Sequence, residues 1–370
     1  MNVLLCGGGT AGHVMPAVAI GELIIKNFPE AKIAFAGREN ADENRAYIKT
    51  GYPLYTVNIQ GLGRSLSINT IKSIFKIILS GRNARRIVKE FKPDLIIGTG
   101  GYVCYPFVRQ GQRMKVKTVL HESNVYPGLV TRILHKKCNK VLLNLEGAKK
   151  YLKYVGNVSV VGNPVRVSFN SLSKNEARRK LGIKNGEIFI VSFGGSLGAS
   201  KLNEDVSEML LKIKKKRNIR YLHATGKAHY SVFKQNNRHL FENASNIKIV
   251  PYIEDMPTVL KAADLAITRS GAMTISELCE CATPSILIPS PNVTANHQYI
   301  NAKYMKDNGA SELIEEKDLT PHVLFEAIES IINDPLRLDS LSKCARSLSS
   351  INADNMIVDA IRETIYGKQS

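Results

Sequence analysis

The residues with the clearest chemical potential follow a short apolar run in the second half of the chain. The run 265–267 predicts a buried parallel strand, and Ser270 and Gly271 predict the cap and the start of a helix directly after it. The first amides of such a helix lack intrahelical partners and lie at the positive end of the helix dipole, so a phosphate fits there. Glu277 returns to the same helical face about two turns later. Because a carboxylate there could accept both hydroxyls of a ribose, the pattern predicts a nucleoside-diphosphate site.

The amides in question belong to Ala272, Met273 and Thr274, which follow Gly271. The same pattern also fits an ordinary strand-to-helix turn that is followed by a solvated glutamate. The choice between a ligand site and a plain turn therefore depends on the rest of the chain.

Residues 2–20 repeat the order of apolar strand, glycine-rich turn and helix, and the helix is expected to begin between His13 and Pro16. The turn has the sequence GGGTAGH, which differs from the G-x-G-x-x-G dinucleotide fingerprint in its usual register. Its glycines permit positive φ and let a ligand approach the backbone. A lone histidine in a loop is usually structural, but His13 closes a phosphate-type loop, and a neutral imidazole suits a general base.

A second glycine turn at 98–102 and the HESN tetrad at 121–124 each follow an apolar run. The carboxyl ends of strands meet at one edge of an open α/β sheet, so Glu122 and Asn124 are expected to point toward His13. Glu122 is the competing candidate for the base. It could equally orient His13 or bind the acceptor.

The pattern restarts in the second half, where the apolar run 188–193 precedes the glycine turn GGSLGA. A chain of 370 residues exceeds one usual core. We therefore expect an α/β protein with two doubly wound Rossmann-like domains that face a cleft. The expected domains are residues 1–163, residues 164–345 and a C-terminal helix within 346–370 that packs back on the first domain.

The composition of the chain also indicates where the protein works and which metal sites it could contain. Apolar runs stay well below the roughly 20 residues that span a bilayer, and Met1 leads directly into a strand, so a cytosolic or peripheral protein is expected. The six cysteines are scattered, and their one close pair is spaced C-x-C. This spacing predicts reduced thiols and no zinc site.

The net charge of +19 is concentrated in the first half, where residues 1–163 hold 24 Lys and Arg against 9 Asp and Glu. Nucleic acid is not the expected partner, because Trp is absent and no recognition motif is present. On the helix expected at 68–79, apolar residues cover an arc of about 200°, whereas packing on one sheet needs roughly 100°. We expect this helix to contact an anionic membrane surface through Ile71, Ile74, Phe75 and Ile78. The alternative is a helix that is buried on two sides with a solvated basic rim.

Seven ordered motifs cover roughly three hundred residues: GGGTAGHVMPA, GTGGYVCYP, HESN, GNPVR, GGSLGA, RSGAMTISEL and NHQYINA. In this combination the chain resembles the MurG family of peptidoglycan synthesis. The resemblance implies the glycosyltransferase-B fold and the transfer of N-acetylglucosamine from UDP-N-acetylglucosamine to the muramyl C4 hydroxyl of lipid I, undecaprenyl-diphosphoryl-MurNAc-pentapeptide. It further implies inversion at the sugar, no metal or other cofactor, and a peripheral location on the cytoplasmic side of the cell membrane.

The resemblance also implies which residues contact the donor. With the diphosphate at the helix start 271–274, these are Thr10, Ala11 and Gly12 of the first loop, Asn124 of HESN, Arg166 of GNPVR, Ser196 of GGSLGA, Ile253 at the uracil, Glu277 at the ribose and Gln298 at the sugar. The chain departs from the family pattern at Ala11, Ser123 and Leu197, where glycine, glutamine and glutamine are common. These departures put in doubt only contacts made by the lost side chains.

Two rival functions remain open at this stage. A glycolipid glycosyltransferase or a non-hydrolysing sugar-nucleotide epimerase could use the same fold, although an epimerase has no evident use for the apolar surface at 68–79. A nucleotide-binding regulatory or redox protein with Rossmann halves is the rival from another class. Against it, the first glycine turn is not a true G-x-G-x-x-G with an acidic residue at the ribose-binding spacing.

Overall fold

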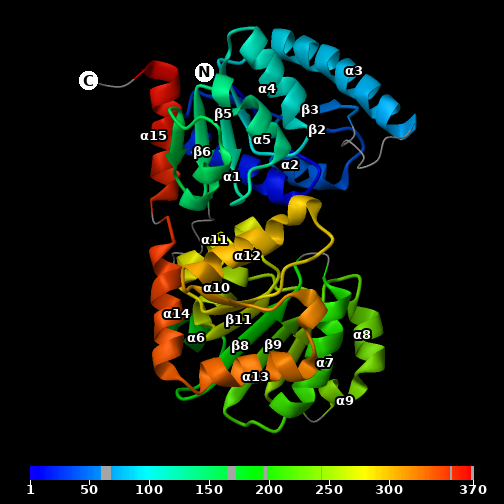
Figure 1. The fold of residues 1–370 in the computed structure, drawn as a ribbon, viewed down its shortest axis with the longest axis vertical. Helices are drawn as coiled ribbons and strands as arrows, with labels where there is room; N and C mark the ends of the chain where they lie inside the picture. The colour runs from blue at the N-terminus through cyan, green and yellow to red at the C-terminus, as the bar shows by residue number, and fades with distance from the viewer. Residues whose placement is uncertain (60–67, 165–171, 196–197, 243, 351, 368–370) are drawn as a thin grey trace. The chain divides into compact units, whose positions relative to one another are not determined.

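The computed structural model describes residues 1–59, 68–164, 172–195, 198–242, 244–350 and 352–367, and of residues 11, 68–78 and 241 it describes only the backbone. The chain divides into two compact units. In Figure 1 the ribbon is coloured by residue number, from blue at the N-terminus to red at the C-terminus. Unit 1 comprises Met1–Val165 and Ser350–Ser370, and unit 2 comprises Arg166–Ser349. Each unit has its own sheet and its own core.

Within the described residues, unit 1 contains a seven-stranded parallel sheet in the order β3-β2-β1-β4-β5-β6-β7. Because the order reverses between β1 and β4, the loops after these two strands lie at the switch point where α/β sheets bind ligands. The strands are β1 (Asn2–Cys6), β2 (Lys32–Arg38), β3 (Leu54–Val57), β4 (Leu95–Gly98), β5 (Lys117–Glu122), β6 (Lys140–Leu143) and β7 (Val158–Val160).

Helices cover both faces of this sheet, because successive residues of each strand point to opposite sides. In β1, Val3 and Leu5 pack with α1 (Ala11–Asn27), α2 (Arg45–Lys49) and α15 (Ala353–Tyr366). Leu4 and Cys6 pack on the other side with α3 (Ile68–Phe91), α4 (Cys104–Arg113) and α5 (Leu129–Leu134). The C-terminal helix α15 therefore belongs to the core of unit 1 and lies beside β5 and β6 (Figure 1). In the described part of unit 1, the 3₁₀ turns are η1 (Asp42–Asn44), η2 (His135–Lys137) and η3 (Glu146–Tyr151).

The described part of unit 2 contains a six-stranded parallel sheet in the order β10-β9-β8-β11-β12-β13. Here the order reverses between β8 and β11. The strands are β8 (Ile188–Phe193), β9 (Ile219–Ala224), β10 (Ile247–Val250), β11 (Leu265–Thr268), β12 (Ser285–Leu287) and β13 (Ser311–Leu313). The α-helices are α6 (Lys174–Lys180), α7 (Ser200–Ile213), α8 (Tyr230–Asn236), α9 (Arg238–Phe241), α10 (Met256–Ala262), α11 (Ala272–Cys281), α12 (His297–Asp307), α13 (Pro321–Ile332) and α14 (Pro335–Ser347), with 3₁₀ turns η5 (Thr294–Asn296) and η6 (Glu316–Asp318).

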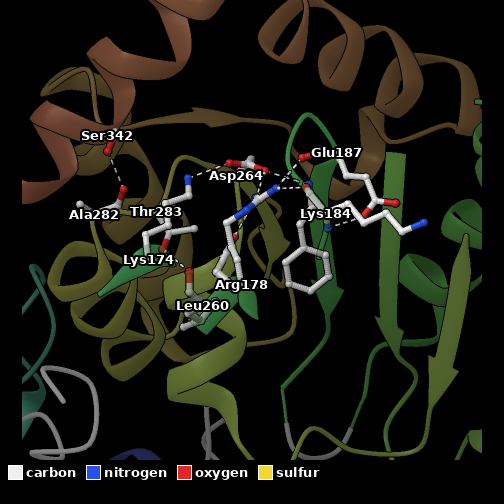
Figure 2. Close-up of polar contacts among 11 residues, drawn as sticks. Lys174, Arg178, Lys184, Glu187, Leu260, Asp264, Ala282, Thr283 and Ser342 are labelled. Carbon is white, nitrogen blue, oxygen red and sulfur yellow. Dashed lines mark hydrogen bonds and ion pairs between the residues drawn. The ribbon is translucent and has the colours of Figure 1, made fainter. Parts of the chain in front are cut away.

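The amino ends of the two central strands of unit 2 are joined by one carboxylate, shown in Figure 2. Asp264 stands directly before β11 and accepts hydrogen bonds from the Phe189 amide of β8 at 2.8 Å and from Arg178 Nη1 of α6 at 2.7 Å. Lys174 Nζ forms an ion pair with its other oxygen at 2.7 Å. These contacts place α6 against the end of the sheet opposite to the glycine turn after β8.

The structure confirms the predicted α/β fold with two parallel, doubly wound sheets. Two short strands, β6 and β13, were not predicted, because β13 contains one apolar residue and β6 directly follows a basic turn. The helix after the first glycine loop begins at Ala11, earlier than expected, and α3 continues to Phe91.

Candidate active site

The loop after β1 holds His13 in the first turn of α1. Thr10 is the N-cap in an extended conformation, and the His13 amide donates to the Thr10 carbonyl at 3.1 Å. The His13 Nδ1 atom lies 3.2 Å from the Gly8 carbonyl oxygen and 3.2 Å from Thr10 Oγ1. Since a carbonyl can only accept, a hydrogen bond to Gly8 requires the proton on Nδ1, which leaves the lone pair of the neutral ring on Nε2. This tautomer gives Nε2 the form that a general base needs.

The second glycine turn packs directly against this histidine. Gly100 has φ +117°, and a Cβ there would lie 2.4 Å from His13 Cδ2. Gly101 has φ +78°, and a Cβ there would lie 1.9 Å from the Gly8 carbonyl oxygen. Thr99 Oγ1 donates to the His13 carbonyl at 2.6 Å. The turn after β4 therefore needs glycine for both its φ values and its contact with the first loop.

Glu122 ends β5 and is 4% exposed. Its Oε1 accepts hydrogen bonds from the amide of Asn124 at 3.1 Å and from Asn124 Nδ2 at 3.3 Å. Its Oε2 accepts from the Gly128 amide at 2.8 Å and from Thr131 Oγ1 at 2.8 Å. The carboxylate thus organises the loop between β5 and α5 and holds the Asn124 side chain.

His121, the neighbour of Glu122 in HESN, is fully buried, and its Nε2 lies 3.0 Å from the Gly162 carbonyl oxygen. Burial lowers the pKa of His121 despite that hydrogen bond and the nearby carboxylate of Glu122. This histidine therefore stays neutral and joins β5 to the turn after β7.

The helix start after β11 differs from the expectation in one detail. Gly271, with φ −63° and ψ 144°, is the N-cap of α11, whereas Ser270 is fully buried and its Oγ donates to the Gln298 carbonyl at 2.8 Å. The prediction of Ser270 as the cap was wrong, because its hydroxyl has a tertiary partner on α12. The described first turn of α11 contains no acidic residue and no side-chain cap, which leaves its positive end suited to an anion.

Glu277 lies on α11 beyond this start, four residues after Met273 and three after Thr274, so the three side chains share one helical face. It is half-buried. Gln298, at the start of α12, accepts a hydrogen bond on Oε1 from the Ser290 amide at 2.9 Å. Asn301 Nδ2 donates to the Ser270 carbonyl at 3.2 Å. Residues of α12 therefore set the position of the turn between β11 and α11.

Other predicted site residues are only partly described. Ile253 is buried, in the loop between β10 and α10. Gly12 and Thr10 are exposed at the start of α1. Arg166, Ser196 and the side chain of Ala11 lie outside the described residues, as do the side chains of Ile71, Ile74, Phe75 and Ile78.

Two residues at this site were missed by sequence reasoning. Tyr47 of α2 is fully buried and donates through its hydroxyl to the Gly7 carbonyl at 3.1 Å. Glu43 of η1 accepts a hydrogen bond from the Gly9 amide at 3.0 Å. Each lies more than thirty residues from its partner, and the local pattern around each one gave no signal for it.

All six cysteines carry free thiols. Among the described residues, no three side chains of His, Cys, Asp or Glu are grouped closely enough to ligate a metal ion. In the described parts of the chain, every helix is too short or too polar to cross a lipid bilayer.

Comparisons with known proteins fit this geometry. Residues 3–143 match the glycosyltransferase family 28 N-terminal domain, and residues 189–357 match the glycosyltransferase family 28 C-terminal domain. The two matches define the class, a family 28 glycosyltransferase with one Rossmann-like domain in each half.

Full-length relatives show which family 28 glycosyltransferases the chain resembles. The chain is 39% identical to the UDP-N-acetylglucosamine--N-acetylmuramyl-(pentapeptide) pyrophosphoryl-undecaprenol N-acetylglucosamine transferase of Acetivibrio thermocellus, over 100% of this chain and 99% of that protein. The enzyme of the same name from Caldanaerobacter subterraneus subsp. tengcongensis is 40% identical over 98% of this chain and 99% of its own length. The crystal structure of Acinetobacter baumannii MurG superposes with a TM-score of 0.78 at 25% identity, covering 98% and 99% of the two chains. The chain belongs to the MurG family of N-acetylglucosaminyltransferases.

The fold is shared more widely than the family. A UDP-GlcNAc 2-epimerase from Neisseria meningitidis, solved with UDP-GlcNAc bound, has a TM-score of 0.67 at 15% identity, with coverage of 98% of this chain and 100% of that chain. A likeness at this identity shows the fold alone.

Proposed function

We infer that this protein transfers N-acetylglucosamine from UDP-N-acetylglucosamine to the muramyl C4 hydroxyl of lipid I, which gives lipid II. The observation that carries the inference is the identity of 39–40% over essentially the full length to enzymes named for this transfer. The histidine tautomer at the first loop and the anion-suited start of α11 are consistent with it.

The donor is assigned to unit 2. The diphosphate lies at residues 271–274, where the helix dipole and the first amides compensate its charge. Glu277, on the same helical face, accepts the ribose hydroxyls. Ile253 contacts the uracil, and Gln298 contacts the sugar. Arg166, Ser196, Thr10, Ala11, Gly12 and Asn124 complete the proposed donor contacts.

The base is assigned to His13 of unit 1. Its Nε2 removes the proton from the acceptor hydroxyl, whose oxygen attacks the anomeric carbon from the face opposite to the diphosphate. The bond between that carbon and the diphosphate oxygen breaks, and UDP leaves with the electron pair. One displacement of this kind inverts the configuration. Glu122 is assigned a positioning role, because its oxygens already accept four hydrogen bonds from its own loop.

The developing charge on UDP can be stabilised by fixed helix amides and by basic side chains, so the reaction does not depend on an added divalent ion. Activity should therefore persist in EDTA. Full loss of activity in EDTA, with rescue by Mg²⁺, would contradict the assignment of the diphosphate to the start of α11.

The direct test is an assay with purified protein, labelled UDP-N-acetylglucosamine and a lipid I analogue. Transfer of the label to the analogue is expected. Release of an epimerised sugar nucleotide with no label on the analogue would instead support the epimerase alternative, whose fold is the same.

An acceptor with an undecaprenyl tail stays in the bilayer, so we further propose that unit 1 binds the anionic cytoplasmic face of the cell membrane. The charge of residues 1–163, 24 basic against 9 acidic residues, supports this. Each basic residue near such a surface contributes about 1 kcal/mol. The proposed apolar contacts are Ile71, Ile74, Phe75 and Ile78 of α3.

Serine at positions 74, 75 and 78 should weaken sedimentation with anionic liposomes and lower activity on lipid I in vesicles, while activity on a short-chain soluble acceptor survives. The matched control replaces Val323 and Leu336 with serine, since these apolar side chains of unit 2 are 37% and 82% exposed. Unchanged liposome binding of the α3 variant would place the membrane surface elsewhere.

A further inference from the structure

The first glycine loop is held from outside by one short segment of unit 1. The segment 42–49 follows β2 and forms η1 and α2. Its Tyr47 hydroxyl donates to the Gly7 carbonyl at 3.1 Å, and its Glu43 Oε1 accepts from the Gly9 amide at 3.0 Å. Gly8, whose carbonyl oxygen accepts from His13 Nδ1, lies between these two points. The position of that carbonyl thus depends on the contacts on both of its neighbours.

The two contacts differ in how firmly they are anchored. Tyr47 is fully buried, and its ring stacks on Phe35 with centroids 4.6 Å apart. Glu43 has a side chain that is 12% exposed and forms an ion pair with Arg38 Nε at 3.6 Å. Burial opposes its ionisation, but hydrogen bonds from its own amide and from the Gly9 amide, together with Arg38, outweigh burial and lower the pKa of Glu43. The carboxylate is therefore charged at neutral pH.

A charged acceptor forms a stronger hydrogen bond with an amide than a neutral one does. Gly9 has φ +89°, and a glycine restricts its own backbone less than any other residue does. Loss of the carboxylate would release the Gly9 amide and allow the Gly8–Gly9 peptide to turn, which would move the Gly8 carbonyl away from His13 Nδ1. The ring would then lose the contact that selects its tautomer.

We propose that Glu43 is a positioning residue for the transfer reaction, which fixes His13 in the tautomer with the lone pair on Nε2 through the Gly9 amide and the Gly8 carbonyl. The proposal rests on His13 as the base of the proposed function. Glu43 contacts neither substrate in this scheme. It acts only on the geometry of the loop and of the imidazole.

The test replaces Glu43 with methionine, which keeps the length of the side chain but removes both acceptor oxygens and the charge. In the full chain, Glu43→Met should lower kcat by about 10²-fold, the scale of a misplaced catalytic group, with the KM for UDP-N-acetylglucosamine unchanged. Glu43→Gln, which keeps one acceptor oxygen, should recover part of that loss. The matched control is Asp42→Ala, because Asp42 lies in the same turn but its side chain is 91% exposed and pairs with the exposed Arg45.

Imidazole ¹⁵N spectra of His13 supply a readout that a purely structural role would not move. Wild type should show the proton on Nδ1, and Glu43→Met should show a mixture of tautomers with a shifted pH profile of kcat. A wild-type ring protonated on Nε2 overturns the proposal without any variant. A Glu43→Met variant with wild-type kcat and tautomer also overturns it.

The same experiments show whether the assignment of His13 as the base fails or only the proposed role of Glu43 fails. If His13→Ala keeps the wild-type kcat, then His13 is not the base and that part of the proposed function fails. The spectra still report whether Glu43 sets the ring in that case. If His13→Ala is inactive but Glu43→Met is not, the base is correct and the role of Glu43 is wrong.

Discussion

The starts of α1 and α11 follow the strands at the switch points of the two sheets, yet the groups that surround the two helix starts differ. At α1, whose first turn also contains no acidic residue, Glu43 accepts a hydrogen bond from the Gly9 amide one residue before the N-cap, and His13 lies in the first turn. At α11, the described first turn has no acidic residue and no histidine, and its cap is a glycine. One helix start is stabilised by internal contacts, whereas the other is suited to an anion from outside.

The difference indicates a division of roles. A helix start that already contacts a carboxylate gains less from a phosphate, since like charges repel. Its internal contacts instead keep a catalytic side chain in one orientation. A helix start without acidic neighbours keeps its full attraction for a diphosphate. We therefore expect substitutions of His13 in α1 to change the rate of transfer and substitutions at α11 to change the affinity for the donor.

The largest effect is expected at His13. His13→Ala removes the proposed base, so kcat should fall by about 10²–10⁴-fold while the donor still binds. Steady-state kinetics with the lipid I analogue measures this. His322→Ala is the control, because the His322 side chain is 68% exposed on α13. A much larger loss in Glu122→Ala than in His13→Ala would reverse the roles of the two residues.

Glu277→Ala changes α11 and should lower the affinity for the donor. The loss of hydrogen bonds to a charged partner costs about 1.5–3 kcal/mol, which corresponds to a rise of roughly ten- to a hundredfold in the KM for the donor. Calorimetric titration with UDP-N-acetylglucosamine provides the independent affinity. Glu326→Ala, at a glutamate whose side chain is 64% exposed, serves as the control. Wild-type affinity in Glu277→Ala would remove this residue from the site.

Ala272→Asp would place a carboxylate in the first turn of α11. A negative charge in the first turn favours the helix itself, so the unfolding temperature should not fall. Donor affinity should fall by roughly tenfold or more through charge repulsion with the diphosphate. Ala272→Asn has the same shape without the charge and should bind the donor more tightly than the aspartate variant. Equal affinities in the two variants would contradict an anion site here.

The effect that is smallest at neutral pH concerns His223, a histidine of unit 2. His223 is fully buried in β9 with Nδ1 2.7 Å from Ser192 Oγ, and burial lowers its pKa to about 3. Between about pH 6.5 and 3, the unfolded chain therefore binds a proton that the folded chain does not. This group makes the free energy of unfolding fall by about 1.4 kcal/mol per pH unit as pH decreases.

Denaturant unfolding of wild type and His223→Asn at several pH values measures this contribution. The variant should lose stability less steeply below pH 6.5. Parallel pH dependences would show that His223 does not stay neutral in the folded state. His13, half-exposed at its loop, has no such burial.

The sequence predicts most of this architecture because the central strands are buried on both faces and appear as continuous apolar runs, such as Leu95–Gly98. The strands β6 and β13 escaped prediction because β13 contains one apolar residue, Leu313, and β6 directly follows a basic turn. The glycine turns, His13 and Glu277 are visible because a strand, a turn and a helix follow one another locally.

What the sequence could not predict depends on contacts between distant residues. Ser270 looks like a helix cap, but its partner is the Gln298 carbonyl, 28 residues away. Glu122 looks like a catalytic acid or base, yet its oxygens accept bonds from a loop whose fold is not visible in the sequence pattern. Glu43 contacts a glycine 34 residues earlier. Only the folded chain brings these groups together.

Millisecond hydrogen exchange of the full chain with and without UDP tests the division of roles most directly. Amides of a first helical turn exchange quickly because they lack intrahelical acceptors, so a bound diphosphate should slow them measurably. UDP should protect the amides of residues 272–274 and leave the exchange of the Gly9 amide unchanged. Protection of Gly9 by UDP, with no change at 272–274, would contradict this division of roles.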